Sequence, residues 1–500
     1  MSSIPPSALP HVAGQDTLKR DVTAFQSFAI AFGFVSIATG IFTAYGAMLA
    51  TSGPMGIWTW PIVVIGQLMV AFVLGSLSAR IPITGYAYQW TSRVANPVLG
   101  WVMGWVSFTF LVVVLCAVDY TIASTVLPAM LHYTGGTFDA WWITTLVIIA
   151  QALLIAFSTK ATQAFNAMAV TLELIGMSCL VVLLFVVGWY RHSLDFSLLF
   201  NTGALSHAGY FSLGTLTHVG PWFMGTLLGA FTIVGFESAA NLAEETNEPA
   251  RVVPRAMWQA IVSVGALGML FLIAITALLG DVGAMTASPT PIADVITRVL
   301  GPVVGSLLLL LVIISIFACG LVILMSGTRL VWAMSRDERF PGWQMLHRIH
   351  PTLRTPVNAT ILVSVVGEAI LSIFSRDTDA LFVLFSAATL LPTIIYTVSV
   401  LMYAIRRNSL PPSQGFSLGR WEKPVVTLAL LWLVFELTIF RDESFFKPWL
   451  YVLIMLAIGG VYLVWLLATR GRHGLAMPDM IAVDAILDAD KGAEYDTAAH

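Results

Sequence analysis

Long, uninterrupted runs of apolar residues recur along this 500-residue chain and restrict it to one class of fold. A helix that crosses a bilayer needs about 20 mainly apolar residues, whereas a strand of a membrane barrel needs about ten, with alternating polarity. The runs here are of the first kind. Hydrophobic residues make up 58% of the chain and charged residues 10%, against about 45–50% and about 25% in soluble domains. The sequence therefore predicts a polytopic, all-α membrane protein.

The apolar runs predict twelve transmembrane helices. Their approximate limits are 25–50, 57–79, 98–122, 140–157, 165–190, 222–243, 256–280, 302–332, 357–374, 378–404, 424–440 and 448–469. The first run is too long for the core of a cleavable signal peptide, so it is retained as a span. Residues 1–24 and 470–500 are polar and are expected to be terminal tails. The C-terminal tail is acidic and is expected to be disordered.

Lys and Arg are unequally divided between the two sets of connections. One set, which includes both tails, holds 19 of the 24 basic residues, and the other holds 5. Short loops rich in Lys and Arg stay on the cytoplasmic side of a membrane. We therefore expect both termini in the cytoplasm, an even number of spans and residence in the plasma membrane.

Two of the expected spans contain an interruption, at residues 36–41 in the first and 233–238 in the sixth. Each is a glycine among small or polar residues, and either one alone is more simply explained by helix packing. Together they occupy corresponding places in two successive sets of five spans with opposite orientation, which favours a transporter binding site. The candidate substrate-binding residues are Ser36, Ile37, Ala38, Thr39, Gly40, Val234, Gly235 and Phe236. Half-helix N-termini there would face a substrate carboxylate, and free carbonyls would face an ammonium.

Several motifs resemble the amino acid–polyamine–organocation superfamily, and within it most closely the amino acid/choline transporter group. They are Thr39-Gly40-Ile41-Phe42, Pro82-Ile83-Thr84-Gly85-Tyr86-Ala87-Tyr88, Gly235-Phe236-Glu237-Ser238-Ala239 with its continuation to Pro249, and the connection from Ser335 to Ala359. The similarity covers about residues 25–470. It implies two inverted five-helix repeats, 25–190 and 222–404, and two peripheral helices within 424–469. It also implies secondary active transport of an amino acid or related amine by alternating access.

The resemblance also assigns roles to three residues. Related exchangers carry a glutamate implicated in proton-linked gating at the position of Glu237, which is otherwise a structural carboxylate that ties the half-helix to its neighbours. Relatives place a gating aromatic at the position of Phe231, which is otherwise a packing residue. Related proton-coupled permeases often carry a lysine where this chain has Glu173, seven residues after Asn166. Glu173 is therefore either a carrier of the coupling proton or a structural hydrogen-bonding group. An ionisable residue inside a bilayer is a functional candidate in any case.

One departure from the family pattern bears on the substrate. Relatives that bind α-amino acids often have Gly-[ST]-Gly in the first-helix break, where this chain has Ala38-Thr39-Gly40. This departure keeps a non-α amino acid or an amine open as the substrate, beside an α-amino acid. An exchanger, a sodium-coupled symporter and a non-transporting sensor of the same fold remain alternatives to the preferred proton-coupled transporter.

Other functional classes lack support in the sequence. No GxxxxGK[ST] or HExxH motif occurs, and the three cysteines are single and lie in apolar runs. We therefore expect no catalytic site, no metal and no cofactor, and no basic patch for nucleic acid. The expected partners are the lipid bilayer, the small substrate and a coupling proton. The pattern gives no indication of the oligomeric state.

Overall fold

The computed structural model describes residues 22–131, 136–374, 380–413, 415–470 and Leu475. Apart from Arg470 and Leu475, the expected disordered tail lies outside these ranges, as does nearly all of the N-terminal tail. Within them the regular structure is helical, apart from one isolated bridge between Val22 and Thr246. The all-α membrane fold expected from the apolar runs is confirmed.

Each expected span coincides with a helix or a series of helices. The first five are α1 (Ala24–Val35) with α2 (Ile37–Ser52), η2 (Pro54–Thr59) with α3 (Trp60–Arg80), α5 (Pro97–Thr121) with η3 (Ile122–Val126) and α6 (Leu127–Leu131), α7 (Thr137–Phe157), and α8 (Thr159–Tyr190). The sixth span consists of α9 (Pro221–Met224), α10 (Thr226–Thr232) and η5 (Phe236–Glu245). The seventh to tenth are α11 (Pro249–Ala277), α14 (Pro302–Arg336), α16 (Val357–Phe374) and α17 (Ala380–Arg406). The last two are α18 (Glu422–Ile439) and α19 (Phe446–Arg470).

Ten helical segments in the described ranges are long and apolar enough to cross a bilayer. Of the other two expected spans, α16 is a shorter apolar helix, and α18 has 18 residues. Because an α-helix rises about 1.5 Å per residue, 18 residues still reach about 27 Å, close to the thickness of the hydrocarbon core. The count of twelve therefore agrees with the helices observed.

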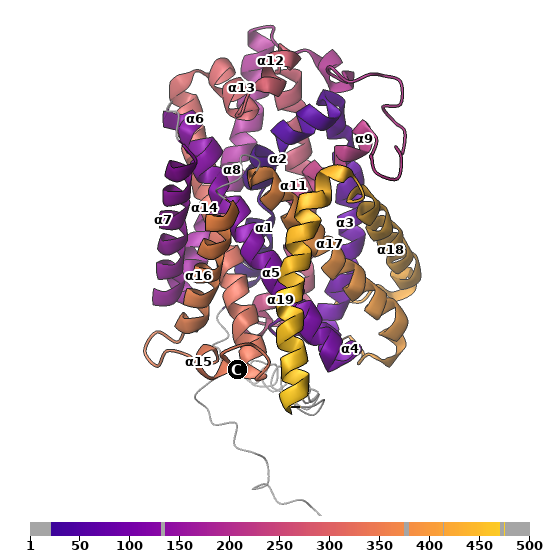
Figure 1. Ribbon diagram of the computed structural model, residues 1–500. Helices are drawn as coiled ribbons and strands as arrows, with labels where there is room; N and C mark the ends of the chain where they lie inside the picture. Colours follow the sequence, from indigo (N-terminus) through magenta and orange to yellow (C-terminus); the bar gives the residue numbers. More distant parts are fainter. Residues whose placement is uncertain (1–21, 132–135, 375–379, 414, 471–474, 476–500) are drawn as a thin grey trace, which may run out of the picture.

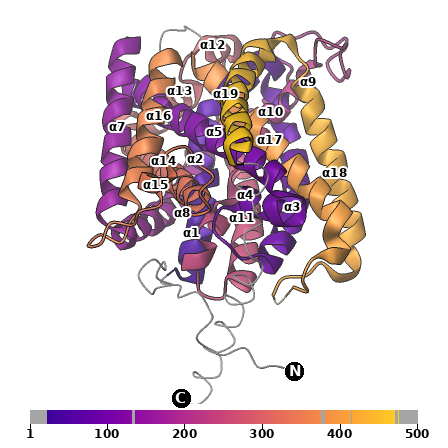
Figure 2. The same ribbon diagram turned by 60° about the horizontal axis from the view of Figure 1, so that its bottom comes forward.

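Short helices mark the two ends of the bundle. At one end lie α4 (Tyr86–Val94) and α15 (Trp343–Leu346), and at the other lie α12 (Val282–Ala287) and α13 (Pro291–Leu300), as Figure 1 shows. We call these the α4 end and the α12 end. Figure 2 shows α7 and α18 at opposite margins of the bundle, with α5 and α11 between them.

Local sequence explains where the helices begin. Proline is the first residue of α5, α9, α11, α13 and α14, where its missing N–H leaves no bond unmade. Asn96 caps α5 by accepting from the Leu99 amide at 2.8 Å, and Ser158 caps α8 by accepting from the Ala161 amide at 3.2 Å. Helix α5 is buried on all sides from Met103 to its last residue, Thr121, which explains why its sequence is apolar all round.

Candidate functional site

The first span is interrupted at a single residue, Ser36. Helix α1 ends at Val35 and α2 begins at Ile37, while Ser36 has φ 34° and ψ 114°. Such a conformation costs an L-residue about 1–3 kcal/mol unless its surroundings enforce it. The Ser36 amide donates to Phe32 O at 2.7 Å, and its hydroxyl accepts from the Thr39 amide at 3.2 Å. Ser36 thus ends one half-helix and caps the next, and the expected unwinding of residues 36–41 is reduced to this position.

A buried carboxyl group from α8 lies against this break. Glu173 Oε1 accepts from the Ser36 hydroxyl at 2.9 Å and from the Ala38 amide at 3.0 Å. The Glu173 side chain is only 1% exposed. Its carboxyl therefore occupies the N-terminus of α2, where the helix dipole and unpaired amides attract negative charge.

The sixth span is interrupted over Ile233, Val234 and Gly235, between α10 and η5. The Ile233 amide still bonds to Gly229 O at 2.8 Å, so the helical pattern stops after it. Gly235 has φ 78°, a left-handed conformation that glycine adopts without a steric penalty. Both interruptions expected from the sequence are therefore present, although neither covers the full run that was expected.

A tyrosine from α17 holds the second break. The Gly235 amide donates to Tyr396 Oη at 2.9 Å, and the Tyr396 hydroxyl donates to Glu237 Oε2 at 2.6 Å. Tyr396 and Glu237 are 0% and 2% exposed. This chain of bonds links the backbone of the break, α17 and an acidic side chain at the start of η5.

The two interrupted helices touch each other on both sides of their breaks. A methyl group at Gly40 would overlap the Thr232 side chain of α10, and one at Gly235 would overlap the Phe34 ring of α1. Absence of a side chain at these two positions lets the half-helices pack at backbone distance. The structure therefore brings the candidate residues of the first and sixth spans together.

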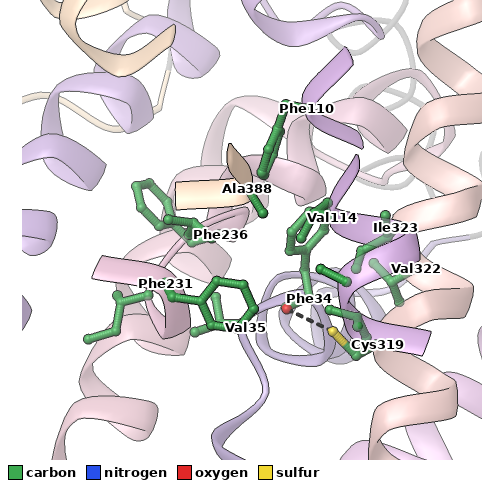
Figure 3. Close-up of a cluster of buried hydrophobic side chains, with 14 of the residues drawn as sticks. Phe34, Val35, Phe110, Val114, Phe231, Phe236, Cys319, Val322, Ile323 and Ala388 are labelled. Carbon is green, nitrogen blue, oxygen red and sulfur yellow. Dashed lines mark hydrogen bonds between the residues drawn. The ribbon is translucent and has the colours of Figure 1, made fainter. Parts of the chain in front are cut away.

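Aromatic rings fill the space beside the breaks, as Figure 3 shows. Phe34 stacks on Phe110 with centroids 6.0 Å apart, and Phe236 lies 5.3 Å from the Tyr396 ring. Phe34, Phe110, Phe231 and Phe236 are each at most 4% exposed. The Cys319 thiol of α14 donates to Phe34 O at 3.1 Å and so ties the end of α1 to α14. A group of phenylalanine faces is thus buried at the candidate site.

The other expected site residues also lie in this region. Ile37, Ala38 and Val234 are buried, at 0%, 0% and 3% exposure, and the Thr39 hydroxyl donates to the Ser36 hydroxyl at 2.8 Å. Glu173 and Glu237 do not share a hydrogen-bond partner: Glu173 faces the first break from α8, whereas Glu237 faces α17.

Sequence reasoning missed Phe34, Phe110, Cys319 and Tyr396. Phe34 could have been found from its place two residues before Ser36. The other three are ordinary residues of apolar spans, and only the packing of α5, α14 and α17 against the breaks identifies them.

Charged residues close the α4 end below the breaks. Arg329 Nε of α14 lies 2.7 Å from Glu245 Oε1 of η5, with side chains 1% and 5% exposed. Arg336 Nη1 lies 3.0 Å from Glu244 Oε2, and Asp337 accepts from the Tyr88 hydroxyl of α4 at 2.7 Å. These contacts join η5, α14 and α4 in one network.

Comparisons with known proteins agree with this architecture. The family model described as "Amino acid permease" matches residues 22–467. The amino-acid permease BAT1 of Arabidopsis thaliana is 24% identical over 456 residues, covering 85% of this chain and 86% of that protein. The GABA-specific permease of Saccharomyces cerevisiae is 25% identical, covering 84% of this chain and 75% of that protein. A Candida albicans protein provisionally named a polyamine transporter is 23% identical, covering 85% and 79% of the two chains.

A family match over most of the chain, together with an all-helical membrane fold and two touching broken helices, points to one kind of protein. The chain belongs to the amino acid permease family of the amino acid–polyamine–organocation superfamily, and it is a multi-pass membrane transporter of amino acids or amines, not an enzyme.

Proposed function

We propose that the chain is a proton-coupled secondary transporter that moves an amino acid or a related amine across the plasma membrane by alternating access. The observation that carries this proposal is the contact between the two broken helices, with a buried carboxyl group beside each break. Transporters built from inverted repeats bind their substrate where such half-helices meet. The α4 end carries most of the basic residues and would face the cytoplasm, together with both termini.

Substrate binding is assigned to the first break, residues 36–40, and the second break, residues 234–236. Their half-helix ends supply amides and carbonyls that the rest of the bundle does not use for regular helix bonds. The name of the yeast relative specifies γ-aminobutyrate, which supports a non-α amino acid among the candidate substrates. Phe231 and Phe236, on either side of the second break, are assigned the gating role because they pack into the closed aromatic group.

Access from the α4 end is closed by the ion pair between Glu245 and Arg329, 2.7 Å apart. This pair joins η5, which belongs to a broken helix, to α14, which is continuous. Opening at this end therefore requires the pair to separate. Separation of a buried ion pair leaves two charges without a partner. We therefore expect water to enter this end as the pair separates and to solvate both charges.

Glu237 is the proposed proton-binding group. As a carboxylate it holds Tyr396 through a charge-assisted bond of 2.6 Å, and Tyr396 in turn holds the Gly235 amide. Protonation removes the charge and weakens this link between α17 and the second break. Proton binding would thereby free η5 to move. Glu173 is the alternative carrier, and its bonds to Ser36 and Ala38 would couple protonation to the first break instead.

The test is uptake by purified protein in proteoliposomes, measured from pH 5 to pH 8. Glu237→Gln is expected to flatten the pH dependence while leaving the protein folded, and Tyr396→Phe is expected to shift it. Glu436→Gln serves as the control, because this buried carboxyl of α18 contacts Gln67 of α3 and neither break. If Glu237→Gln keeps the wild-type pH profile, Glu237 is not the proton site, and the same series on Glu173→Gln decides for the alternative.

Two further measurements separate the rival functions. Counterflow of labelled substrate distinguishes a transporter from a sensor, since a sensor binds its ligand without exchanging it. Uptake in potassium buffer with and without sodium distinguishes proton coupling from sodium coupling. Uptake that requires sodium and ignores pH would contradict the proton-coupled mechanism.

A further inference from the structure

The N-terminal amides of α2 are already used within the protein. The Ala38 amide donates to Glu173, the Thr39 amide to the Ser36 hydroxyl, and the Ser36 amide to Phe32 O at 2.7 Å. The Ile37 amide also faces the Glu173 carboxyl. A helix has four N-terminal amides without an intrahelical partner, and a transporter half-helix can offer them to a substrate carboxylate. Here the chain's own Glu173 carboxyl, Ser36 hydroxyl and Phe32 carbonyl take that place.

The surrounding helices also lack a basic partner for a substrate carboxylate. No Lys, Arg or His occurs in residues 24–52, 97–131 or 221–245, which include both interrupted spans and α5. Arg329 of α14 is buried, but it is paired with Glu245 at the α4 end. A buried carboxylate without a cation or donors is strongly disfavoured, and more so beside other acidic groups.

The same surroundings suit a positive charge. Acidic side chains lie at the starts of both half-helices, Glu173 against α2 and Glu237 in η5. The carbonyl ends of α1 and α10 point to the breaks from the other side, where a helix attracts cations. Phe34, Phe231 and Phe236 would present their faces once the breaks separate (Figure 3), and an aromatic face attracts an ammonium group.

We infer that this site recognises its substrate by a positively charged ammonium group and does not bind a carboxylate at the N-terminus of α2. The substrate class is therefore organic amines that lack a carboxylate. Glu173 is the specificity-determining residue, because it fills the amide positions that a carboxylate would require. This inference rests on the proposed transport function and narrows its substrate.

The test compares pairs of ligands in which one member carries a carboxylate and the other lacks it. Purified protein in nanodiscs is titrated with ornithine and putrescine, arginine and agmatine, and glycine betaine and choline, with thermal stabilisation as the readout. In the pair that binds, the amine without the carboxylate is expected to give half-maximal stabilisation at a concentration at least tenfold lower. Proteoliposome counterflow with the same pair then shows whether the bound compound is exchanged.

Two variants connect the preference to Glu173. Glu173→Ala frees the Ala38 amide and is expected to reduce the preference for the amine at least tenfold. Glu173→Gln keeps an oxygen acceptor there and is expected to reduce it less, so it provides a second reading if the alanine variant does not fold. Glu436→Ala, a buried carboxyl in contact with Gln67 and away from the breaks, is expected to leave the preference unchanged.

The outcomes separate this inference from the proposed function. Equal or tighter binding of the carboxylate-bearing member, with counterflow intact, overturns the inference and leaves the transporter assignment standing. An unchanged preference in both Glu173 variants overturns the role of Glu173. Binding without counterflow contradicts transport but not the substrate class, and no stabilisation by any of the six compounds overturns the substrate class and leaves the transport function standing.

Discussion

At the scale of single residues, the contact between the breaks depends on the absence of a side chain at Gly235. Its φ of 78° is a conformation that costs an ordinary L-residue about 1–2 kcal/mol. A methyl group there would also overlap the ring of Phe34. The φ angle and the Phe34 ring thus both require glycine at this position, and the second break cannot form in this geometry with a larger residue.

Gly235→Ala is therefore expected to destabilise the protein by about 2 kcal/mol or more, from backbone strain and overpacking together. Thermal unfolding of the purified protein would show a lower midpoint. The double variant Gly235→Ala with Phe34→Ala should recover the stability lost through overlap with the ring, but not the stability lost through backbone strain. Gly460→Ala is the control, because a methyl at that position of α19 meets no atom within 4 Å. Independent, additive effects of the two changes would contradict the packing explanation.

At the scale of elements, the α1–α2 break is stabilised by one serine and one distant glutamate. Ser36 caps α2 through its hydroxyl, which also bonds to Glu173 at 2.9 Å. The bend is strained, but the Ser36, Ala38 and Thr39 amides all have partners, so the first span keeps a defined shape at a point where its helix stops. A helix interruption buried in a membrane protein is tolerated only when its backbone groups find such partners.

Ser36→Ala is expected to cost about 1 kcal/mol, the usual loss when an N-cap serine is replaced. Ser36→Gly should cost less, because glycine relieves the strain at positive φ although it also lacks the hydroxyl. Both are measured as shifts in the unfolding midpoint and in uptake. Ser158→Ala removes an ordinary cap of α8, whose hydroxyl accepts from the Ala161 amide, and should lower stability without changing substrate preference. A larger loss in the glycine variant would argue against strain at Ser36.

A second element-scale feature lies outside the membrane-spanning helices, in the turn between α18 and η8 (Glu443–Phe445). Asp442 Oδ2 accepts from the Val219 amide at 2.8 Å and so fastens the loop before α9. Partial burial by itself raises the pKa of Asp442, but donations from Val219 and Ser444 outweigh burial and hold the pKa below its usual range. Folding therefore favours the ionised carboxylate.

This lowered pKa predicts a specific pH dependence. A carboxyl whose pKa falls on folding stabilises the protein above its unfolded pKa, about 3.9 for Asp, and loses that contribution as pH falls through the folded pKa. Asp442→Asn should therefore melt below the wild type at pH 7, and the gap should narrow below about pH 4. Glu443→Gln is the control, since that side chain is 69% exposed and its Oε1 makes only a surface contact, 3.7 Å from His218 Nδ1. A gap that widens toward acid would contradict the assignment.

At the scale of the whole molecule, two of the contacts that hold α14 against the broken helices are buried. Cys319 donates to Phe34 O of α1, and Arg329 pairs with Glu245 of η5. Both contacts join a continuous helix to an interrupted one. Rocking of one helix group against the other at the α4 end would have to break both, so the reactivity of Cys319 reports on opening.

Glu245→Gln is expected to speed alkylation of Cys319 by a maleimide at least tenfold, because breaking a buried ion pair removes about 3–5 kcal/mol from the closed state. The measurement uses a protein in which Cys179, the exposed cysteine, and Cys116 are replaced. A matched protein that keeps only Cys116, buried on α5 and bonded to Gly367 O, should label at an unchanged rate. Equal acceleration of both cysteines would indicate general loosening instead of opening at α14.

The sequence alone determined the helices, their number and the approximate positions of the two breaks. Apolar length and helix-weakening glycines are local properties, so they can be recognised without a fold. The sequence also singled out Glu173 and Glu237, because a charge inside a bilayer is conspicuous wherever it occurs.

Only the tertiary structure decided what those charges touch. Glu173 meets Ser36 across 137 positions of chain, and Tyr396 meets Glu237 across 159. The first break covers one residue instead of the expected six, because its amides bond to Glu173 of α8 and to Ser36 itself. No local sequence pattern specifies these partners. Hydrogen-bond satisfaction in a membrane depends on neighbouring helices, and those neighbours are set by packing, so the occupied N-terminus of α2 became visible only in the folded molecule.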